Sequence, residues 1–298
     1  MKKIIIFMLS FCLMFCPLSL QSMCVSAQET SQPESADAKT NWDSEASLLR
    51  VNNIGQKILK ANGLPDTITF KVSDDETINA YANIYKEVYV YRGLLEYVQS
   101  DDELAGVIAH ELGHIVNAHC AKQSVINVIS TALQPTTQNE KLNLTLQAAQ
   151  QLSLLKVSRN DEYEADRTAV DLLVKAGINP LSTISVLNKI CGNYFDLLQT
   201  HPSGEKRLLS IYDYTNYNYP QIIKAGYKEE SYNKALLVIN NTLEKRNKSE
   251  KKLAKVEKEQ LKLKEQRAKR AKRIEKSTNP WEQSFVALQL LSAVQNLR

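Results

Sequence analysis

Three side chains with the spacing of a metal site lie in the stretch "VIAHELGHIVNAHC", residues 107–120. Residues four apart on a helix lie one above the other, so we expect His110 and His114 to project from one face. Two imidazole nitrogens placed in this way can bind one Zn²⁺ at about 2.0–2.1 Å. Glu111 follows the first histidine, where its carboxylate can take a proton from water without binding the metal. The pattern therefore predicts two metal ligands and a general base on one helix.

The surroundings of the two histidines favour a metal site. Both stand in an apolar run, in which unpaired imidazoles would be costly to bury; the run consists of Val107, Ile108, Ala109, Leu112, Ile115 and Val116. The alternative is a pair of core histidines that hydrogen-bond other groups, with the glutamate there by coincidence.

A catalytic zinc needs a third protein ligand and one position left for water. One family of solutions places Gly three residues and His six residues after the second histidine, but here these positions hold Asn117 and Cys120. On a continuous helix His119 would face away from His110, so we expect it to pack or hydrogen-bond on the opposite side. The third ligand is then expected on a later segment.

The stretch "SRNDEYEADRTAVDLL", residues 158–173, offers carboxylates for this purpose. Glu162 and Asp166 share one helix face, so one could bind the metal while the other orients a ligand imidazole. By spacing alone Glu164 competes with Glu162. The alternative for the whole stretch is a charged, solvated helix face.

The elements that must position these residues are mainly helical. Apolar spacing and end signals predict helices at 44–62, 100–123 with Ser100 as N-cap, and about 140–157, 159–176, 181–192 and 204–213. Residues 67–91 change character: the short β-branched and aromatic runs "TITFKV", "INAYA" and "EVYVYRG", the last ending at Gly93, predict a small antiparallel sheet. The predicted fold class is α+β, predominantly α.

The first residues have the pattern of an export signal: basic "MKK", an apolar run, and "VSA" at 25–27, which predicts cleavage near Ala27. An uncleaved anchor or a lipidated cysteine is the alternative. We therefore expect a signal peptide at 1–27, a flexible lead-in at 28–43, and an exported, periplasmic chain, with membrane association left open. Two cysteines outside the signal, Cys120 and Cys191, could pair or be small buried residues.

The C-terminal part differs in charge. Residues 244–276 hold 15 Lys and Arg against 6 Glu, a local charge of +9. Because the net charge of the whole chain is +4, the rest of the chain carries −5. We expect domains at 44–218 and 219–298, the second a helical extension containing this basic segment. A solvated single helix is the favoured interpretation of the segment, and binding to an anionic membrane or polymer surface is the alternative. Nothing predicts a specific nucleic acid partner.

Several motifs together resemble one family. "HELGH" followed by "SRNDEYEADRTA" is similar to the HExxH zinc metalloendopeptidases that include the CAAX prenyl proteases, the HtpX heat-shock proteases and the periplasmic proteases that enhance β-barrel assembly. "INAYA", "VYVYRGLLEY", "HIVNAHC" and "THPSGEKRL" fit the same pattern, so the resemblance covers about residues 45–213. The glycine usual between the two strands is missing from "NIYKEV", and the basic tail has no counterpart.

The resemblance implies a zincin-like domain and a role for each matching residue. Glu162 would be the third zinc ligand, with Asp166 supporting the site. His201 would stabilise the oxyanion or cap the zinc, and Arg207 would hold that loop or a substrate carbonyl. An extended peptide would add to the strand that contains Asn79, Ala80 and Tyr81.

These observations predict a zinc-dependent metalloendopeptidase with one Zn²⁺ per chain, held by His110, His114 and Glu162. Zinc would lower the pKa of its water, and Glu111 would remove a proton and later deliver it to the leaving amine. The expected substrates are polypeptides, including misfolded or envelope proteins. The alternative is a quality-control binding protein in which the zinc is structural or latched by His201.

Overall fold

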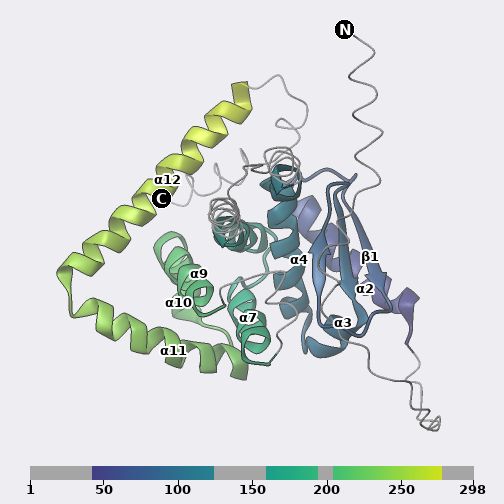
Figure 1. The fold of residues 1–298 in the computed structure, drawn as a ribbon, viewed down its shortest axis with the longest axis horizontal. Coiled ribbons are helices and arrows are strands. Elements are labelled where there is room, and N and C mark those ends of the chain that lie inside the picture. The colour runs from purple at the N-terminus through teal and green to yellow at the C-terminus, as the bar shows by residue number, and fades with distance from the viewer. Residues whose placement is uncertain (1–41, 124–158, 194–203, 277–298) are drawn as a thin grey trace, which may run out of the picture. The chain divides into compact units, whose positions relative to one another are not determined.

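The computed structural model describes residues 42–123, 159–193 and 204–276, which are coloured in Figure 1. The expected signal peptide, the helix expected near 140–157, His201 and the last residues of the tail lie outside these ranges. The predicted domain boundary at 218/219 remains a prediction. Within the described part, the predominantly helical α+β class is confirmed.

The first helix, α2 (Ser44–Asn62), has clear signals at both ends. The Asp43 carboxylate accepts a hydrogen bond from the Ala46 amide at 2.8 Å, as an N-cap does. Gly63 ends the helix with φ of 62°, a conformation that glycine adopts without strain. The chain then enters the sheet, and α2 packs against β1 (Thr69–Ser73) and against α4 (Asp101–Val116).

The sheet has three strands in the order β1-β3-β2, with β2 at Ala80–Ala82 and β3 at Glu87–Tyr91. β2 and β3 are antiparallel, as expected for neighbours joined by a short turn, and the Tyr81 ring stacks on Tyr89 with centroids 4.9 Å apart. β1 and β3 are parallel, so the prediction of an antiparallel sheet is wrong for this pair. The sheet is mixed: β3 lies between the two earlier strands and runs parallel to β1 and antiparallel to β2. This order places β2 at an edge of the sheet.

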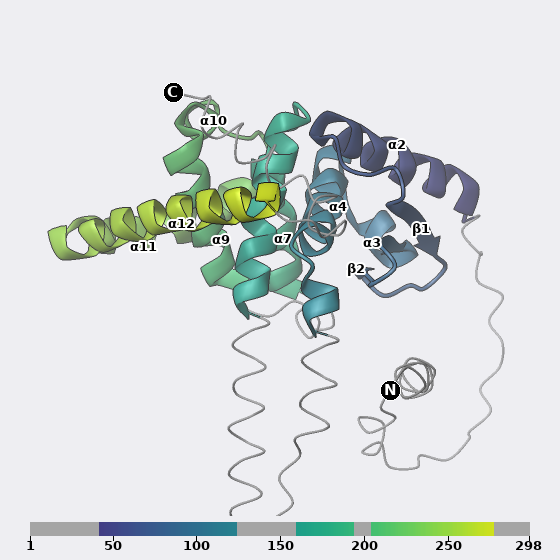
Figure 2. The ribbon, with the colours of Figure 1, turned by 90° about the horizontal axis from the view of Figure 1, so that it is seen from above.

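After the short helix α3 (Arg92–Tyr97), helix α4 runs through the centre of the fold (Figure 2). Ser100 caps it by accepting from the Glu103 amide at 3.2 Å, and three acidic residues fill its first turn. Every residue from Glu103 to Val116 is buried. A helix that is buried on all sides has to be covered all round, and α2, the sheet and α7 (Leu181–Asn193) are among the elements that cover α4.

The remaining helices form the second half of the fold. They are a helix described over residues 159–175, α7, α9 (Gly204–Asn218), α10 (Pro220–Ala225), α11 (Glu230–Asn247) and α12 (Glu250–Lys276). α7 packs against α4, α9 and α11. One apolar cluster joins the 159–175 helix, α7, α9 and α11, with Val170, Ile184, Leu208, Tyr214, Tyr232 and Ile239 among its buried members.

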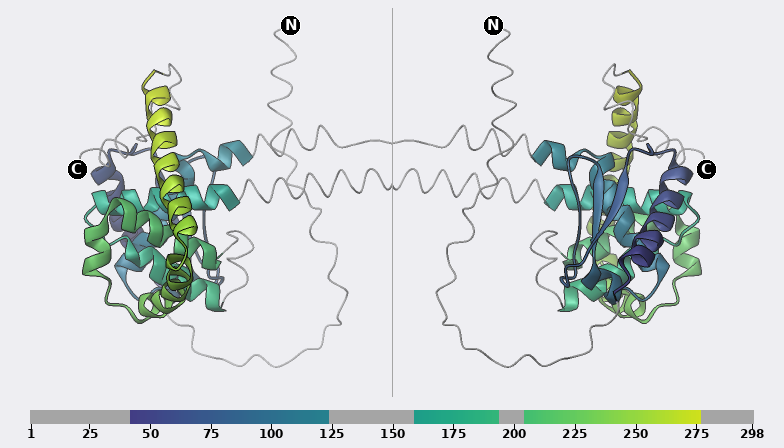
Figure 3. Two further views of the ribbon diagram at one scale, coloured as in Figure 1. Left: turned by 90° about the vertical axis from the view of Figure 1, so that its left-hand side faces the viewer. Right: turned by 90° about the vertical axis from the view of Figure 1, so that its right-hand side faces the viewer.

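The basic segment lies mostly in α12, which is a single helix on the opposite side of the fold from α2 and the sheet (Figure 3). Two arginines fasten this region to the core. Arg246 forms a two-point ion pair with Asp213 at 2.6 and 2.8 Å, and Arg267 contacts Asp171 and Tyr214. Among the described helices, none contains an apolar stretch long enough to cross a membrane.

Candidate metal centre

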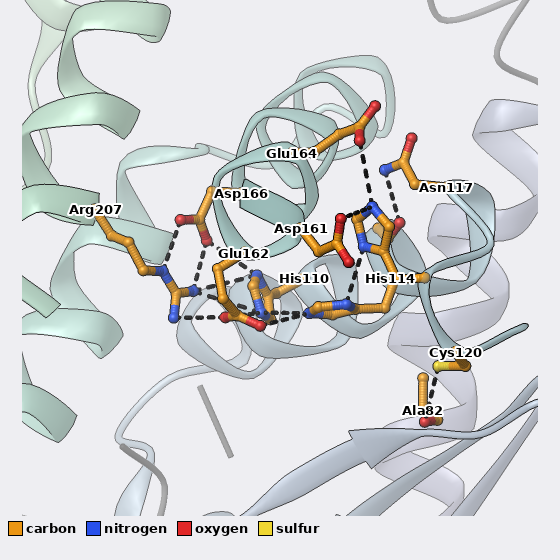
Figure 4. A network of polar contacts seen from close by, with 12 residues as sticks. Ala82, His110, His114, Asn117, Cys120, Asp161, Glu162, Glu164, Asp166 and Arg207 are labelled. Carbon is orange, nitrogen blue, oxygen red and sulfur yellow. Dashed lines mark hydrogen bonds and ion pairs between the residues drawn. The ribbon is translucent and has the colours of Figure 1, made fainter. Parts of the chain in front are cut away.

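Two helices bring three potential metal donors to one point (Figure 4). His110 and His114 project from α4, and Glu162 comes from the first turns of the 159–175 helix. The two Nε2 atoms lie 3.1 Å apart, and the Glu162 carboxylate oxygens lie 3.3 Å from His110 Nε2 and 3.2 Å from His114 Nε2. All three side chains are buried.

The distances between these donors suit a zinc ion. Ligand atoms at about 2.0–2.1 Å from a tetrahedral zinc lie about 3.3 Å from one another, close to the observed 3.1–3.3 Å. Two imidazoles and one carboxylate are also a donor set of catalytic zinc sites, in which the fourth position stays open for water. The residues present therefore fit the metal that the sequence predicts.

Asp166 and Arg207 lie behind the first histidine. The Asp166 carboxylate is 3.0 Å from His110 Nδ1, and it accepts two hydrogen bonds from Arg207 at 2.7 and 2.8 Å. Arg207 Nη1 is also 2.8 Å from Glu162. Burial by itself raises the pKa of Asp166, but the Arg207 charge and these hydrogen bonds outweigh it and hold the pKa at about 2. Asp166 is therefore a fixed anion that orients the His110 ring.

The two histidines differ in their proton affinity. Burial and the Arg207 charge lower the pKa of His110, but Asp166 and Glu162 outweigh both and raise it to about 9. The pKa of His114 is lowered, mainly by burial. A metal that binds at this centre would therefore displace a proton from His110, whereas the neutral His114 can bind a metal without losing one.

His119 does not face away from the site, and that prediction is wrong. Its Nδ1 atom lies 3.1 Å from Nδ1 of His114, and its ring is buried. The cause is the end of α4 at Val116, three residues earlier than a continuous helix would require. Asn117 caps the helix by donating to the Gly113 carbonyl at 2.8 Å, and Ala118 takes a left-handed φ of 55° that turns the chain back.

The structure distinguishes the two glutamates that spacing alone left in competition. Glu162 lies with the two imidazoles, whereas Glu164 lies 3.3 Å from His119 Nε2 on the far side of His114. Asp161 is on that side too, 3.8 Å from His119 Nε2, and Lys122 is paired with it at 2.7 Å. The side chains of Asp161, Glu164 and Asn117 are grouped there in Figure 4.

Glu111 is buried and lines a small cavity of about 40 Å³ next to His110. Most of the other lining side chains are apolar and come from β2, α4 and α7; they include Ala80, Val107, Val186, Leu187 and Ile190. The expected general base thus borders a space of mainly apolar character.

The edge strand β2 lies over α4. The Asn79 carbonyl and the Asn83 amide bond to β3, so by the alternation of a strand the backbone groups of Ala80 and Ala82 point to the other edge. The Asn79 side chain accepts from the Ala80 amide at 2.9 Å, and the Cys120 thiol donates to the Ala82 carbonyl at 3.3 Å. Burial raises the pKa of that thiol to about 11, so it keeps its proton.

Three further outcomes concern single residues. Arg207 is buried among the carboxylates of the site, and its expected contacts with a loop or a substrate carbonyl remain predictions. The Cys120 thiol bonds to the Ala82 carbonyl, and because the side chain of Cys191 lies outside the residues that the structure describes, pairing of the two cysteines remains a prediction. Sequence reasoning missed Gly113, where a Cβ atom would lie 2.6 Å from the Ala165 carbonyl oxygen; its place inside the histidine motif was the available signal.

Comparisons with known proteins agree with this geometry. The beta-barrel assembly-enhancing protease of Yersinia pestis is 26% identical over 179 residues, which are 53% of this chain and 37% of that protein. Metalloprotease YcaL of Escherichia coli (strain K12) is 29% identical over 178 residues, 53% of this chain and 67% of that protein. Mitochondrial metalloendopeptidase OMA1 of Arabidopsis thaliana is 36% identical over 141 residues, 46% of this chain and 29% of that protein.

The chain spans well under two thirds of the length of the beta-barrel assembly-enhancing proteases that it matches. A family model described as peptidase family M48 matches residues 46–215, which include α4, the 159–175 helix and most of α9. This range contains every donor of the candidate centre and covers more than half of the sequence. The chain therefore belongs to peptidase family M48.

Proposed function

We propose that this protein is a zinc-dependent metalloendopeptidase in which His110, His114 and Glu162 hold the metal and Glu111 is the general base. The observation that carries the proposal is the convergence of three buried donors within 3.3 Å of one another, beside a buried glutamate that borders a cavity.

A bound zinc ion supplies a Lewis acid that lowers the pKa of water and polarises a peptide carbonyl. The residues of the chain supply the rest of the chemistry. Glu111 accepts a proton from the attacking water and delivers it to the leaving amine nitrogen. Asp166 holds His110 in the orientation for binding, and Arg207 fixes Asp166 by a two-point ion pair. His201 is the proposed oxyanion donor or resting-state cap.

The proposed substrate is an extended polypeptide that adds to the edge of β2. The outward carbonyl of Ala80 and the outward amide of Ala82 offer hydrogen bonds for this, with Asn79 and Tyr81 flanking them, whereas the Ala80 amide and the Ala82 carbonyl already bond to the side chains of Asn79 and Cys120. Because the cavity beside Glu111 is mainly apolar, it suits an apolar substrate side chain. The name of the Yersinia relative links that protein to beta-barrel assembly, which supports envelope proteins such as beta-barrels as the proposed substrate class.

The proposed location is the periplasm, and its support is the signal-like pattern of residues 1–27. Within the part of α12 whose side chains the structure describes, most lysines and arginines are exposed, so we keep contact with an anionic membrane or polymer surface as a proposal.

The test is digestion of an unfolded protein such as casein by the wild type and by Glu111→Gln, with zinc measured in both. Glu111→Gln should abolish cleavage and keep zinc near one per chain, because it removes the base and leaves the three donors in place. Glu230→Gln is the matched control, since Glu230 is exposed on α11 far from the centre in sequence. Unchanged cleavage in Glu111→Gln, or loss of its zinc, contradicts the assigned role.

A binding protein with a latched centre is the second candidate, because Arg207 is paired at 2.8 Å with the expected ligand Glu162. Assays of the wild type and His201→Ala separate the two functions. Proteolysis by either protein supports the enzyme, whereas tight binding of unfolded protein without cleavage by either supports the binder.

A further inference from the structure

His119 contacts the candidate metal centre from outside the donor set. The end of α4 and the left-handed Ala118 turn its ring back, so that it stands nearly perpendicular to His114 at 75°, with centroids 5.1 Å apart. The ring is 4% exposed. Such a buried imidazole needs partners for both nitrogens, and the structure provides them on two opposite sides.

The first partner is His114. The two Nδ1 atoms lie 3.1 Å apart, a distance at which one nitrogen must carry the proton and the other must accept it. His114 turns its Nε2 toward His110 and Glu162, so this nitrogen must be unprotonated for metal binding. A neutral imidazole with a bare Nε2 carries its proton on Nδ1. His114 Nδ1 therefore donates the hydrogen bond, and His119 Nδ1 accepts it.

The second partner is a pair of carboxylates. Because His119 accepts at Nδ1, its own proton sits on Nε2, which lies 3.3 Å from Glu164 and 3.8 Å from Asp161. The sequence of groups is thus a carboxylate, His119 and His114. If His119 donated to His114 instead, the proton of His114 would sit on its Nε2, and the centre would lose one metal ligand.

A second cation is the competing interpretation, because His119, Asp161 and Glu164 lie close enough to hold one. Lys122 argues against it, since its ammonium already pairs with Asp161 at 2.7 Å. An ion on His119 Nε2 would also move the ring proton to Nδ1, so that His119 would donate to His114.

We propose that His119 is a positioning residue of the metal centre. Its Nδ1 accepts a hydrogen bond from His114 Nδ1, while Glu164 and Asp161 hold the His119 ring from the other side. This arrangement keeps His114 Nε2 directed at the metal. The two ligand histidines are then held differently, His110 directly by Asp166 and His114 through a second imidazole. This inference rests on the proposed metal-binding function.

The test compares zinc affinity, measured by competition with a chromogenic chelator, in three proteins. His119→Phe keeps the size of the ring and removes both nitrogens, so we expect zinc affinity to fall about 10–100-fold, the usual effect of losing such a partner. His119→Asn puts an amide oxygen near the position of Nδ1 and should recover most of the affinity. The visible spectrum of the cobalt-substituted protein should change in His119→Phe and return toward the wild-type form in His119→Asn.

Unfolding of the metal-free proteins separates positioning from packing. A purely structural His119 would lower stability in His119→Phe without changing the zinc affinity of the folded fraction, and that result overturns the inference. If His119→Phe does not fold, Glu164→Leu takes its place, because the Glu164 side chain is 40% exposed and its substitution by leucine removes the acceptor nearest to His119 Nε2. Zinc affinity equal to that of the wild type in Glu164→Leu then overturns the inference.

The outcomes also separate this inference from the proposed function. A wild type that binds no zinc refutes the metal site itself. A wild type that binds one zinc, with unchanged affinity in His119→Phe, refutes only the positioning role. Two zinc ions in the wild type and one in His119→Phe show that His119 is a ligand of a second ion, which also overturns the inference.

Discussion

Substitution of Gly113 by alanine tests whether close helix packing sets the position of the third donor. A Cβ atom at Gly113 would lie 2.6 Å from the carbonyl oxygen and 2.9 Å from Cα of Ala165. Both contacts are with backbone atoms, so no side chain can rotate out of the way. The 159–175 helix must then withdraw by about 0.8 Å, the difference between 2.6 Å and the 3.4 Å at which ordinary van der Waals contact begins.

Glu162 is less than one turn from Ala165 on the same helix and moves with it. A shift of about 0.8 Å is large beside the tolerance of about 0.2 Å on zinc–ligand distances, so zinc affinity should fall. A misplacement of about 1 Å can cost about 100-fold in rate, and we expect a loss of this order in peptide cleavage. Overpacking costs about 1–3 kcal/mol, of which the better helix propensity of alanine offsets about 1 kcal/mol.

The measurements are zinc affinity by chelator competition, casein digestion, and the free energy of unfolding in urea. Gly106→Ala on the same helix is the control, because its Cβ would lie 3.2 Å from the Thr183 backbone, near the ordinary limit. It gains the same helix propensity and should keep wild-type zinc affinity. Wild-type zinc affinity in Gly113→Ala, or an equal loss in Gly106→Ala, would refute the reasoning.

Three further predictions concern the rest of the fold. Asp171→Ala should lower the free energy of unfolding by about 3–5 kcal/mol in urea titrations, because Asp171 is the buried partner of Arg267 and of the Tyr214 and Tyr219 hydroxyls; a loss below about 1 kcal/mol would contradict this. Burial raises the pKa of Tyr214 and Tyr219, so the folded state keeps protons that the unfolded state releases above about pH 10; stability should be complete below that pH and fall above it, and phenolate absorbance should show these two tyrosines ionising only on unfolding. Asn117→Ala should cost about 1–2 kcal/mol, because it removes the hydrogen bonds to the Gly113 carbonyl and the Thr168 hydroxyl at the C-terminal end of α4, measured by thermal unfolding.

Features that depend on neighbouring residues were readable from the sequence. The start of α4 follows from Ser100 and the acidic residues after it, because an N-cap bonds to amides in its own first turn. The common face of His110 and His114 follows from helix geometry alone. Strand positions followed from the β-branched and aromatic runs, since these depend on which faces are buried.

Features set by distant residues were not readable. The end of α4 depends on Asn117, which bonds both Gly113 and Thr168, 51 residues away, while Ala118 gives no sign of a left-handed turn. This is why the spacing of a continuous helix puts His119 on the wrong side. Glu162 and Glu164 differ by two positions on a helix, so spacing leaves them in competition; the family resemblance points to Glu162, and the rotation of that helix against α4 is the physical reason why it meets the imidazoles.

Long-range pairing explains the other differences. The parallel register of β1 and β3 is a matter of strand order, which alternation does not encode. The contact of Arg267 with Asp171 joins residues 96 apart, and nothing in a run of lysines and arginines distinguishes this arginine from its neighbours.

Metal removal and reconstitution test the central claim most directly. The purified protein should contain about one zinc per chain, lose casein cleavage when a chelator removes that zinc, and regain it when zinc is returned. Glu162→Gln should bind zinc more weakly and recover little activity under the same conditions, because the anionic donor of the centre is gone. Cleavage that survives complete removal of the metal, or full zinc affinity in Glu162→Gln, would contradict the account.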